Sequence, residues 1–347
     1  MSDPRLHRYS RQILFERIGP EGQAKLRQGR ALLVGCGALG SVLANHLVRA
    51  GIGFLRICDR DFLEIDNLQR QALYDEDDLA ANLPKAAAAV RKLARINREV
   101  TLEAVVDDVN PANIERLAEG VDVLLDGTDN FDTRYLINDL AVQSGRPWVY
   151  GAVVGSTGLV MTIVPGDTPC LRCVFDEPPP PELSPTCDTA GVLGPAVDLV
   201  ASLQAIEAIK LLAGRRAEIN RHLLNIDAWS GSIRAVKVAQ ARADRSCPCC
   251  TDRVFAYLTG EAASQVTTLC GRDAVQVRPA VSRSVALEVL AGRLAAAGAV
   301  DVSSNVYLMR ARIEDCEVTV FADGRTIVKG TADPARAKSI CARYLGA

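Results

Sequence analysis

Two pairs of cysteines have the spacing of a metal site. One pair is Cys170-Leu-Arg-Cys173 and the other is Cys247-Pro-Cys-Cys250. Four thiolates from two C-x-x-C pairs form a closed tetrahedral zinc site with no open position for water. We therefore predict a structural Zn²⁺ bound by these four residues. Cys249 stays open as an alternative to Cys247 or Cys250, although C-P-x-C spacing favours the outer two.

A glycine-rich turn predicts a nucleotide site. Gly35, Gly37, Ala38 and Gly40 belong to a G-x-G-x-x-G sequence that follows an apolar run and opens a helical pattern. Glycines let a phosphate chain approach the backbone, and the amides at a helix N-terminus favour its charge. Asp59, 19 residues after Gly40, could bind ribose hydroxyls at the end of the next strand. The motif does not identify the nucleotide, so an NAD-dependent dehydrogenase and a purely structural turn stay open.

The polar loop at residues 61–71 could bind phosphate. It follows the second predicted strand, and ligands bind beyond the carboxyl ends of strands in open α/β sheets. Its candidates are Asp61, Asn67, Gln69 and Arg70. Arg70 could clamp a phosphate with paired donors. The alternative is an ordinary solvated loop.

Two further charged residues fit a nucleotide triphosphate. Lys85 follows Pro84 at the start of a predicted helix, where the helix dipole disfavours a cation, so a phosphate partner is one interpretation and an exposed lysine the other. The segment Asp126-Gly-Thr128-Asp129-Asn130 ends a predicted strand. Carboxylates there suit Mg²⁺, although Asp129 could instead cap the next helix.

Cys187 is a candidate nucleophile. It lies outside both metal pairs, in a loop of about 30 residues at 165–194, and loops of that length are usually functional or disordered. A loop thiol can react if its pKa is lowered and it is accessible, whereas a buried filler is the alternative. Other cysteines in apolar contexts are predicted as small core residues: Cys36, Cys58, Cys270, Cys316 and Cys341.

Alternating strands and helices must position these residues. Apolar runs predict strands at residues 31–34, 54–58, 100–105, 121–125 and 148–153, and helical spacing predicts helices at 39–50, 84–97, 112–118 and 133–143. This order indicates a doubly wound, mostly parallel, Rossmann-like α/β sheet. The second half adds a helix at 195–213 and strands at 223–227 and 232–238.

The pattern changes after the second cysteine pair. We divide the chain into a nucleotide-binding domain at 1–253, which includes the zinc site, and a small α+β domain at 254–347. In the latter we predict strands at 266–277, 306–312, 318–322 and 326–329, and helices at 285–297 and 334–345.

Composition narrows the function classes. The 347 residues carry a formal net charge of −2, which provides no footprint for nucleic acid or an anionic membrane. The N-terminus lacks an apolar signal segment. Eleven cysteines without such a signal indicate a reducing compartment, and we expect the cytoplasm. The uncharged stretch at 147–166 is interrupted by glycines and predicts two buried strands rather than a membrane span.

Together these motifs resemble one family, the adenylyltransferases of the ThiF, MoeB and HesA group. That group activates ubiquitin-like sulfur-carrier proteins in thiamine and molybdopterin synthesis. The resemblance covers residues 5–250, and its matching parts are Arg8-Tyr-Ser-Arg11-Gln-Ile13, Gly35 to Gly40, Asp59-x-Asp61, Asn67-Leu-Gln-Arg70-Gln71, Pro84-Lys85, Thr128-Asp129-Asn130, both cysteine pairs and Thr186-Cys187. Asn82 departs from a glycine that is common in the family. Two C-terminal segments, Leu269-Cys-Gly-Arg-Asp273 and Phe321-Ala-Asp-Gly-Arg325, are similar to longer thiamine-type members.

The resemblance implies adenylylation of a C-terminal Gly-Gly carboxylate on a small β-grasp carrier, with ATP, Mg²⁺ and Zn²⁺. It implies that Asp59 binds ribose, Arg70 and Lys85 supply positive charge, Asn67 and Gln69 orient phosphate oxygens, and Asp129 holds Mg²⁺. It places Arg11 in the active site of the opposite subunit of a homodimer. It also implies that Cys187 can accept the activated carrier, and that a cysteine desulfurase or rhodanese-type protein donates sulfur.

Two alternatives remain at this point. One is an NAD-dependent oxidoreductase with a structural zinc, although none of the three histidines lies in a convincing acid/base context. The other is a non-catalytic partner subunit of an activating enzyme, which the presence of Arg11, Arg70, Lys85 and Asp129 disfavours. The sequence identifies neither the carrier nor the role of residues 254–347.

Overall fold

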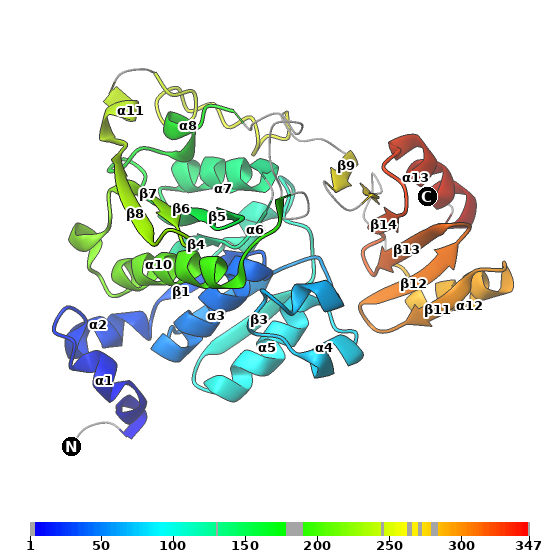
Figure 1. The fold of residues 1–347 in the computed structure, drawn as a ribbon, viewed down its shortest axis with the longest axis horizontal. Helices are drawn as coiled ribbons and strands as arrows, with labels where there is room; N and C mark the ends of the chain where they lie inside the picture. Colours follow the sequence, from blue (N-terminus) through cyan, green and yellow to red (C-terminus); the bar gives the residue numbers. More distant parts are fainter. Residues whose placement is uncertain are drawn as a thin grey trace. The chain divides into compact units, whose positions relative to one another are not determined.

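A computed structural model describes residues 4–129, 131–177, 190–243, 246–261, 266–269, 273–278 and 284–345. The chain divides into two compact units, the larger within Met1–Pro180 and Gly191–Ala262, and the smaller including Ala263–Ala347 (Figure 1). All the described candidate site residues lie in the larger unit. The domain boundary that we place between residues 253 and 254 stays a prediction.

The larger unit is built on one eight-stranded sheet with the order β3-β2-β1-β4-β5-β6-β7-β8. The first five strands in this order are parallel, and β6, β7 and β8 continue the sheet in antiparallel pairs. This confirms the predicted mostly parallel α/β sheet. The strands are β1 (Arg30–Val34), β2 (Phe54–Cys58), β3 (Thr101–Val105), β4 (Val123–Asp126), β5 (Trp148–Val154), β6 (Thr157–Ile163), β7 (His222–Asp227) and β8 (Ser232–Lys237).

Helices cover both faces of this sheet and enclose two apolar cores (Figure 1). On one face lie α3 (Ala38–Ala50), α5 (Lys85–Ile96) and α10 (Gly194–Leu212). On the other lie α6 (Ile114–Leu117), α7 (Phe131–Ser144) and α8 (Leu171–Val174). Helix α3 ends where predicted because Gly51 takes a left-handed backbone, with φ of 85°.

The larger unit also contains shorter helices, which are η1 (Pro4–Tyr9), α1 (Ser10–Ile13), α2 (Gly19–Leu26), η2 (Ile65–Asn67), α4 (Glu76–Ala80), η4 (Arg216–Glu218) and α11 (Ala239–Ala243). The sequence spacing did not predict the first three, at the N-terminus, because they are short and carry few apolar positions.

The uncharged stretch at 147–166 forms an antiparallel hairpin. Strands β5 and β6 pair from Trp148 with Ile163 to Val154 with Thr157, which confirms the prediction of two strands joined by a turn. Both are central in the sheet, and apolar residues on both strands are buried. Among the described residues, no helix has the length and apolar character needed to cross a membrane.

The smaller unit has a six-stranded sheet with the order β11-β12-β13-β14-β10-β9 and its own apolar core. The predicted single strand at 266–277 is instead two antiparallel strands, β9 and β10, which pair from Val266 with Val277 to Leu269 with Ala274. Strand β11 was not predicted. The elements are β9 (Val266–Leu269), β10 (Ala274–Val277), α12 (Leu287–Ala296), β11 (Val300–Ser304), β12 (Leu308–Ile313), β13 (Cys316–Phe321), β14 (Thr326–Lys329), α13 (Pro334–Ile340) and η5 (Cys341–Leu345).

Candidate functional site

The glycine turn follows β1, at the point where the order of the strands in the sheet reverses. Chain order places β2 on one side of β1 and β4 on the other, and ligands of open α/β sheets bind at the carboxyl ends of such strands. Close backbone packing explains the glycines. A Cβ on Gly35, whose φ is 85°, would lie 2.6 Å from the Gly127 carbonyl oxygen, and one on Gly40 would lie 2.0 Å from that of Gly35. Gly37 is the N-cap of α3, where no side chain caps the helix, and Ala38 is the first residue of the helix.

Asp59 is fixed behind this turn. Its side chain is buried, its Oδ2 accepts the Cys36 backbone N–H at 2.6 Å, and its Oδ1 accepts that of Asp61 at 2.8 Å. Burial raises the pKa of Asp59, although the positive charge of Lys85 acts in the opposite direction. Asp59, which we predict to bind the ribose hydroxyls, is thus held in a fixed orientation at the end of β2.

Lys85 is buried at the first position of α5, with 3% of its surface exposed. Its Nζ lies 3.5 Å from Asp61 Oδ2, and its backbone N–H donates to the Asp61 carbonyl oxygen at 2.9 Å. The hydroxyl of Tyr74 lies 2.8 Å from the Cys36 carbonyl oxygen and 3.1 Å from that of Lys85. An ion pair with Asp61 therefore stabilises a lysine that the helix dipole disfavours, and Tyr74 connects it to the glycine turn.

The loop after β2 is folded by its own polar residues. Asn67 is buried and its Nδ2 donates to Asp66 Oδ1 at 3.0 Å. Its Oδ1 accepts the Glu64 backbone N–H at 3.4 Å. Arg70 is half-buried and donates through Nη1 to the Asp66 carbonyl oxygen at 2.6 Å, whereas Gln69 is exposed. Asn67 thus has a structural role in this loop, and Arg70 is anchored beside it.

The two acids after β4 have different environments. Asp126 is fully buried, and its Oδ1 accepts the N–H and hydroxyl of Thr128 at 2.9 and 2.8 Å. Its Oδ2 accepts from Arg134 Nε at 3.1 Å. Asp129 is exposed, so of these two carboxylates it is the one available to a metal ion. Asn130, predicted to contact the nucleotide, lies outside the described residues.

Sequence reasoning missed two arginines of this site. Arg134 also donates to the Thr128 carbonyl oxygen at 2.7 Å, so it holds the loop that carries Asp129. Arg60 pairs with Asp108 at 2.9 Å and with Asp61 at 3.7 Å, and both arginines interact electrostatically with Asp129. Arg60 could have been suspected from its position between Asp59 and Asp61, whereas the partners of Arg134 become apparent only in the fold.

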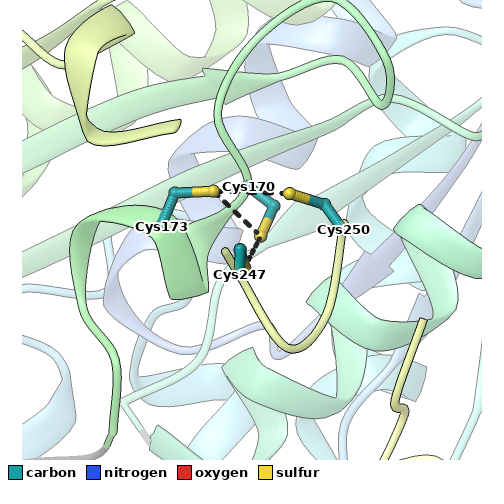
Figure 2. Close-up of side chains that lie close together, drawn as sticks. All are labelled: Cys170, Cys173, Cys247 and Cys250. Carbon is teal, nitrogen blue, oxygen red and sulfur yellow. Dashed lines mark hydrogen bonds between the residues drawn. The ribbon is translucent and has the colours of Figure 1, made fainter. Parts of the chain in front are cut away.

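The two cysteine pairs meet on the α7 face of the sheet. The sulfurs of Cys170, Cys173, Cys247 and Cys250 lie within 4.8 Å of one another and point toward a common centre (Figure 2). The neighbouring sulfurs are 3.4–3.8 Å apart. A tetrahedral site with Zn–S bonds of about 2.3 Å sets its sulfurs about 3.8 Å apart. The quartet that we predicted therefore has the dimensions of a tetrathiolate zinc site, and the buried Cys249 is not one of the four.

The remaining candidates lie at the surface or are not described. Arg11 is exposed at the end of the N-terminal segment, beside the exposed apolar residues Leu14 and Phe15. Cys187 and its predicted role as a thiol nucleophile lie outside the described residues. Of the cysteines predicted to fill the core, Cys36, Cys58, Cys316 and Cys341 are buried, and Cys270 is not described.

Known proteins resemble this chain over most of its length. The ThiF family model matches residues 9–249. A Bacillus subtilis protein named sulfur carrier protein ThiS adenylyltransferase is 46% identical over 339 residues, which cover 98% of this chain and 99% of that protein. The SAMP-activating enzyme E1 of Haloferax volcanii is 40% identical over 245 residues, which cover 71% of this chain and 88% of that protein. Crystal structures of E. coli MccB share the fold, with a TM-score of 0.61 at 22% identity over 70% of this chain and 74% of that chain.

Proposed function

The chain belongs to the ThiF family and is an adenylyltransferase, and we propose that its substrate is the C-terminal glycine of a thiamine-type sulfur-carrier protein. The observation that carries this proposal is the 46% identity, over nearly the whole length of both chains, to an enzyme named for a sulfur carrier. The family match and the relative named as an adenylyltransferase support adenylylation over the NAD-dependent alternative. The non-catalytic alternative is disfavoured because the charged residues that the reaction needs are present.

The reaction transfers an adenylyl group. A carboxylate oxygen of the carrier attacks the α-phosphorus of ATP and forms a new P–O bond. The bond from that phosphorus to the bridging oxygen breaks, and pyrophosphate leaves with the electron pair. Such chemistry depends on positioning and charge neutralisation rather than on covalent help from the protein.

The residues of the glycine turn and its surroundings supply both requirements. The backbone edge at Gly37 and Ala38 would receive phosphate at the N-terminus of α3, and Asp59 would bind the ribose hydroxyls. Lys85 and Arg70 would place positive charge beside the phosphates. Asn67 is buried within its own loop, so we assign it to shaping that loop around the phosphates, and we assign the exposed Gln69 to contacting them.

We assign Mg²⁺ to Asp129. Its carboxylate is exposed at the carboxyl end of β4, and hard oxygen ligands suit this ion. Bound with ATP, Mg²⁺ would neutralise charge on the phosphates. The negative charge of Asp129 contributes to raising the pKa of Arg60 and of Arg134, and Arg134 also donates to the carbonyl oxygen of Thr128 beside it. Thr128 and Asn130 belong to the same proposed site.

We assign Zn²⁺ to the four-cysteine centre in a structural role. Four thiolates complete a tetrahedron, so no substrate or water position remains. The pairs are 77 residues apart along the chain, and the metal would close the segment between them. Metal analysis should find about one zinc per chain, and chelation should lower the unfolding temperature because metal binding contributes to folding.

Two partners complete the proposal. Arg11 would enter the active site of a second copy in a homodimer, and the exposed apolar Leu14 and Phe15 support an interface there. The Cys187 thiol would receive the activated carrier, with sulfur supplied by a cysteine desulfurase or a rhodanese-type protein. The described cysteines form no disulfide, which suits a reducing cytoplasm, where we place the enzyme.

The experiment that tests this proposal incubates the protein with MgATP and a thiamine-type carrier that ends in Gly-Gly. Mass spectrometry of the carrier should show a mass increase of one adenylyl group. A carrier without its last glycine is the control and should remain unmodified. A carrier that stays unmodified while the enzyme is folded and binds ATP would overturn the assignment of substrate. Cys187→Ala should keep adenylylation but lose sulfur transfer, and loss of adenylylation would contradict the separate role of this thiol.

A further inference from the structure

We propose that Asn138 is a positioning residue that holds the two cysteine pairs of the four-cysteine centre together. The side chain binds no metal itself. It acts on the two segments that carry the ligands, through one hydrogen bond to each. This inference rests on the proposed zinc site, and its test is designed so that the two can fail separately.

The evidence is a pair of hydrogen bonds from one buried carboxamide. Asn138 lies in the middle of α7 and is fully buried. Its Oδ1 accepts the backbone N–H of Leu171, the residue after Cys170, at 2.8 Å. Its Nδ2 donates to the sulfur of Cys249, the residue before Cys250, at 3.3 Å. One end of the amide therefore contacts the first cysteine pair and the other end contacts the second.

The same helix anchors both ligand segments at neighbouring positions. The hydroxyl of Tyr135 donates to the carbonyl oxygen of Phe175, two residues after Cys173, at 2.9 Å. The carboxylate of Asp139 accepts the backbone N–H of Tyr257, beyond the second pair, at 3.0 Å. Asn138 lies between Tyr135 and Asp139 in the helix, and its side chain bonds to both ligand segments. Helix α7 thus provides a rigid support, and Asn138 is the point where both ligand pairs meet it.

The physical consequence concerns the retention of metal. Four sulfurs that carry negative charge repel one another, so the two segments tend to separate whenever the metal leaves or one ligand detaches. A buried bridge between the segments opposes this separation and keeps the detached ligand close to the ion. Residues that orient metal ligands without binding the metal typically change metal affinity about 10–100-fold when they are replaced.

The test compares zinc release from wild type and three variants. Asn138→Leu keeps a similar volume and removes both hydrogen bonds. Cys249→Ala removes the sulfur acceptor, together with the contacts of that sulfur to Cys170 and Asp139, and leaves the bond of Asn138 to Leu171. Ser144→Ala is the matched control, because its hydroxyl donates to the carbonyl oxygen of Leu140 within the same helix. Zinc transfer to a chromophoric chelator is followed well below the unfolding temperature, and the absorption spectrum of Co²⁺-loaded protein reports the ligand geometry.

We expect Asn138→Leu to release zinc about 10–100-fold faster than wild type, with a smaller acceleration in Cys249→Ala and none in Ser144→Ala. The Co²⁺ spectrum of Asn138→Leu should also shift. If Asn138→Leu does not fold, the Cys249→Ala rate decides the question alone. Wild-type release rates and spectra in the folded variants, even with a lower unfolding temperature, would overturn the role of Asn138. A wild-type protein that binds no zinc would overturn the zinc site itself.

Discussion

Arg134 and Asp126 form an ion pair that is buried on both sides, with Nε 3.1 Å from Oδ2 and side chains 5% and 0% exposed. The pair lies at the carboxyl end of β4 and continues through Arg134 to the carbonyl oxygens of Thr128 and Gly151. Asp126 is therefore occupied by the fold, and the loop that it stabilises carries the exposed Asp129. Asp126, which the sequence places beside the proposed Mg²⁺ site, therefore supports the loop that carries Asp129.

Loss of one member of this pair should be costly. Arg134→Met leaves Asp126 buried without its charge partner, and removal of one side of a buried pair typically destabilises a protein by about 3–5 kcal/mol. Denaturant unfolding measures this loss. Arg221→Ala, which breaks the exposed pair with Asp167, is the control and should cost about 0–1 kcal/mol. Equal losses in the two variants would contradict the structural role of the Arg134–Asp126 pair.

Lys85 should matter for chemistry more than for stability. Removing one preorganised cationic donor beside the phosphates typically lowers kcat by about 10²–10³-fold. We expect Lys85→Met to lose ATP–pyrophosphate exchange by that factor while remaining folded. Arg95→Ala removes an exposed charge from the same helix and should exchange at the wild-type rate. If both variants lose exchange equally, the general positive charge of α5 is responsible rather than the position of Lys85.

The sequence predicted the sheet and the four-cysteine centre well because both depend on local patterns. Apolar runs mark β1 and β2, and two C-x-x-C pairs specify ligands wherever the chain brings them. The sequence did not predict contacts between residues that only the folded chain brings together. The partners of Arg134 and Asn138 lie 6 to 111 residues away along the chain, and no spacing rule connects them. The division of residues 266–277 into β9 and β10 was missed because both segments carry β-branched residues that favour strands.

The proposed homodimer with composite sites makes a specific prediction for mixed variants. Arg11→Ala and Lys85→Met should each be nearly inactive alone, since each damages both sites of a homodimer. If Arg11 serves the partner's site, a heterodimer of the two variants contains one intact site and one doubly defective site. Random exchange of subunits in an equal mixture should then restore about a quarter of wild-type activity. No recovery after verified subunit exchange would place Arg11 outside the site of the opposite subunit.

Asp59 should couple folding to pH in a predictable direction. Burial raises its pKa in the folded protein, so the folded state holds this proton more tightly than the unfolded state. Its linked contribution to stability is therefore present at low pH and is lost as the pH rises through the folded-state pKa. Relative to Asp59→Asn, wild type should gain stability as the pH falls through that range. Melting curves of both proteins across pH 4–8 measure this difference in stability. A difference that stays constant with pH, or that changes in the opposite direction, would contradict the prediction.

The most direct test of the central claim is ATP–pyrophosphate exchange, with labelled pyrophosphate and candidate carriers supplied one at a time. We predict exchange that requires MgATP and a thiamine-type carrier with an intact Gly-Gly terminus, and that disappears when the terminal glycine is removed. Exchange in the absence of any carrier, or none with any Gly-Gly carrier while the enzyme is folded and binds ATP, would contradict the account.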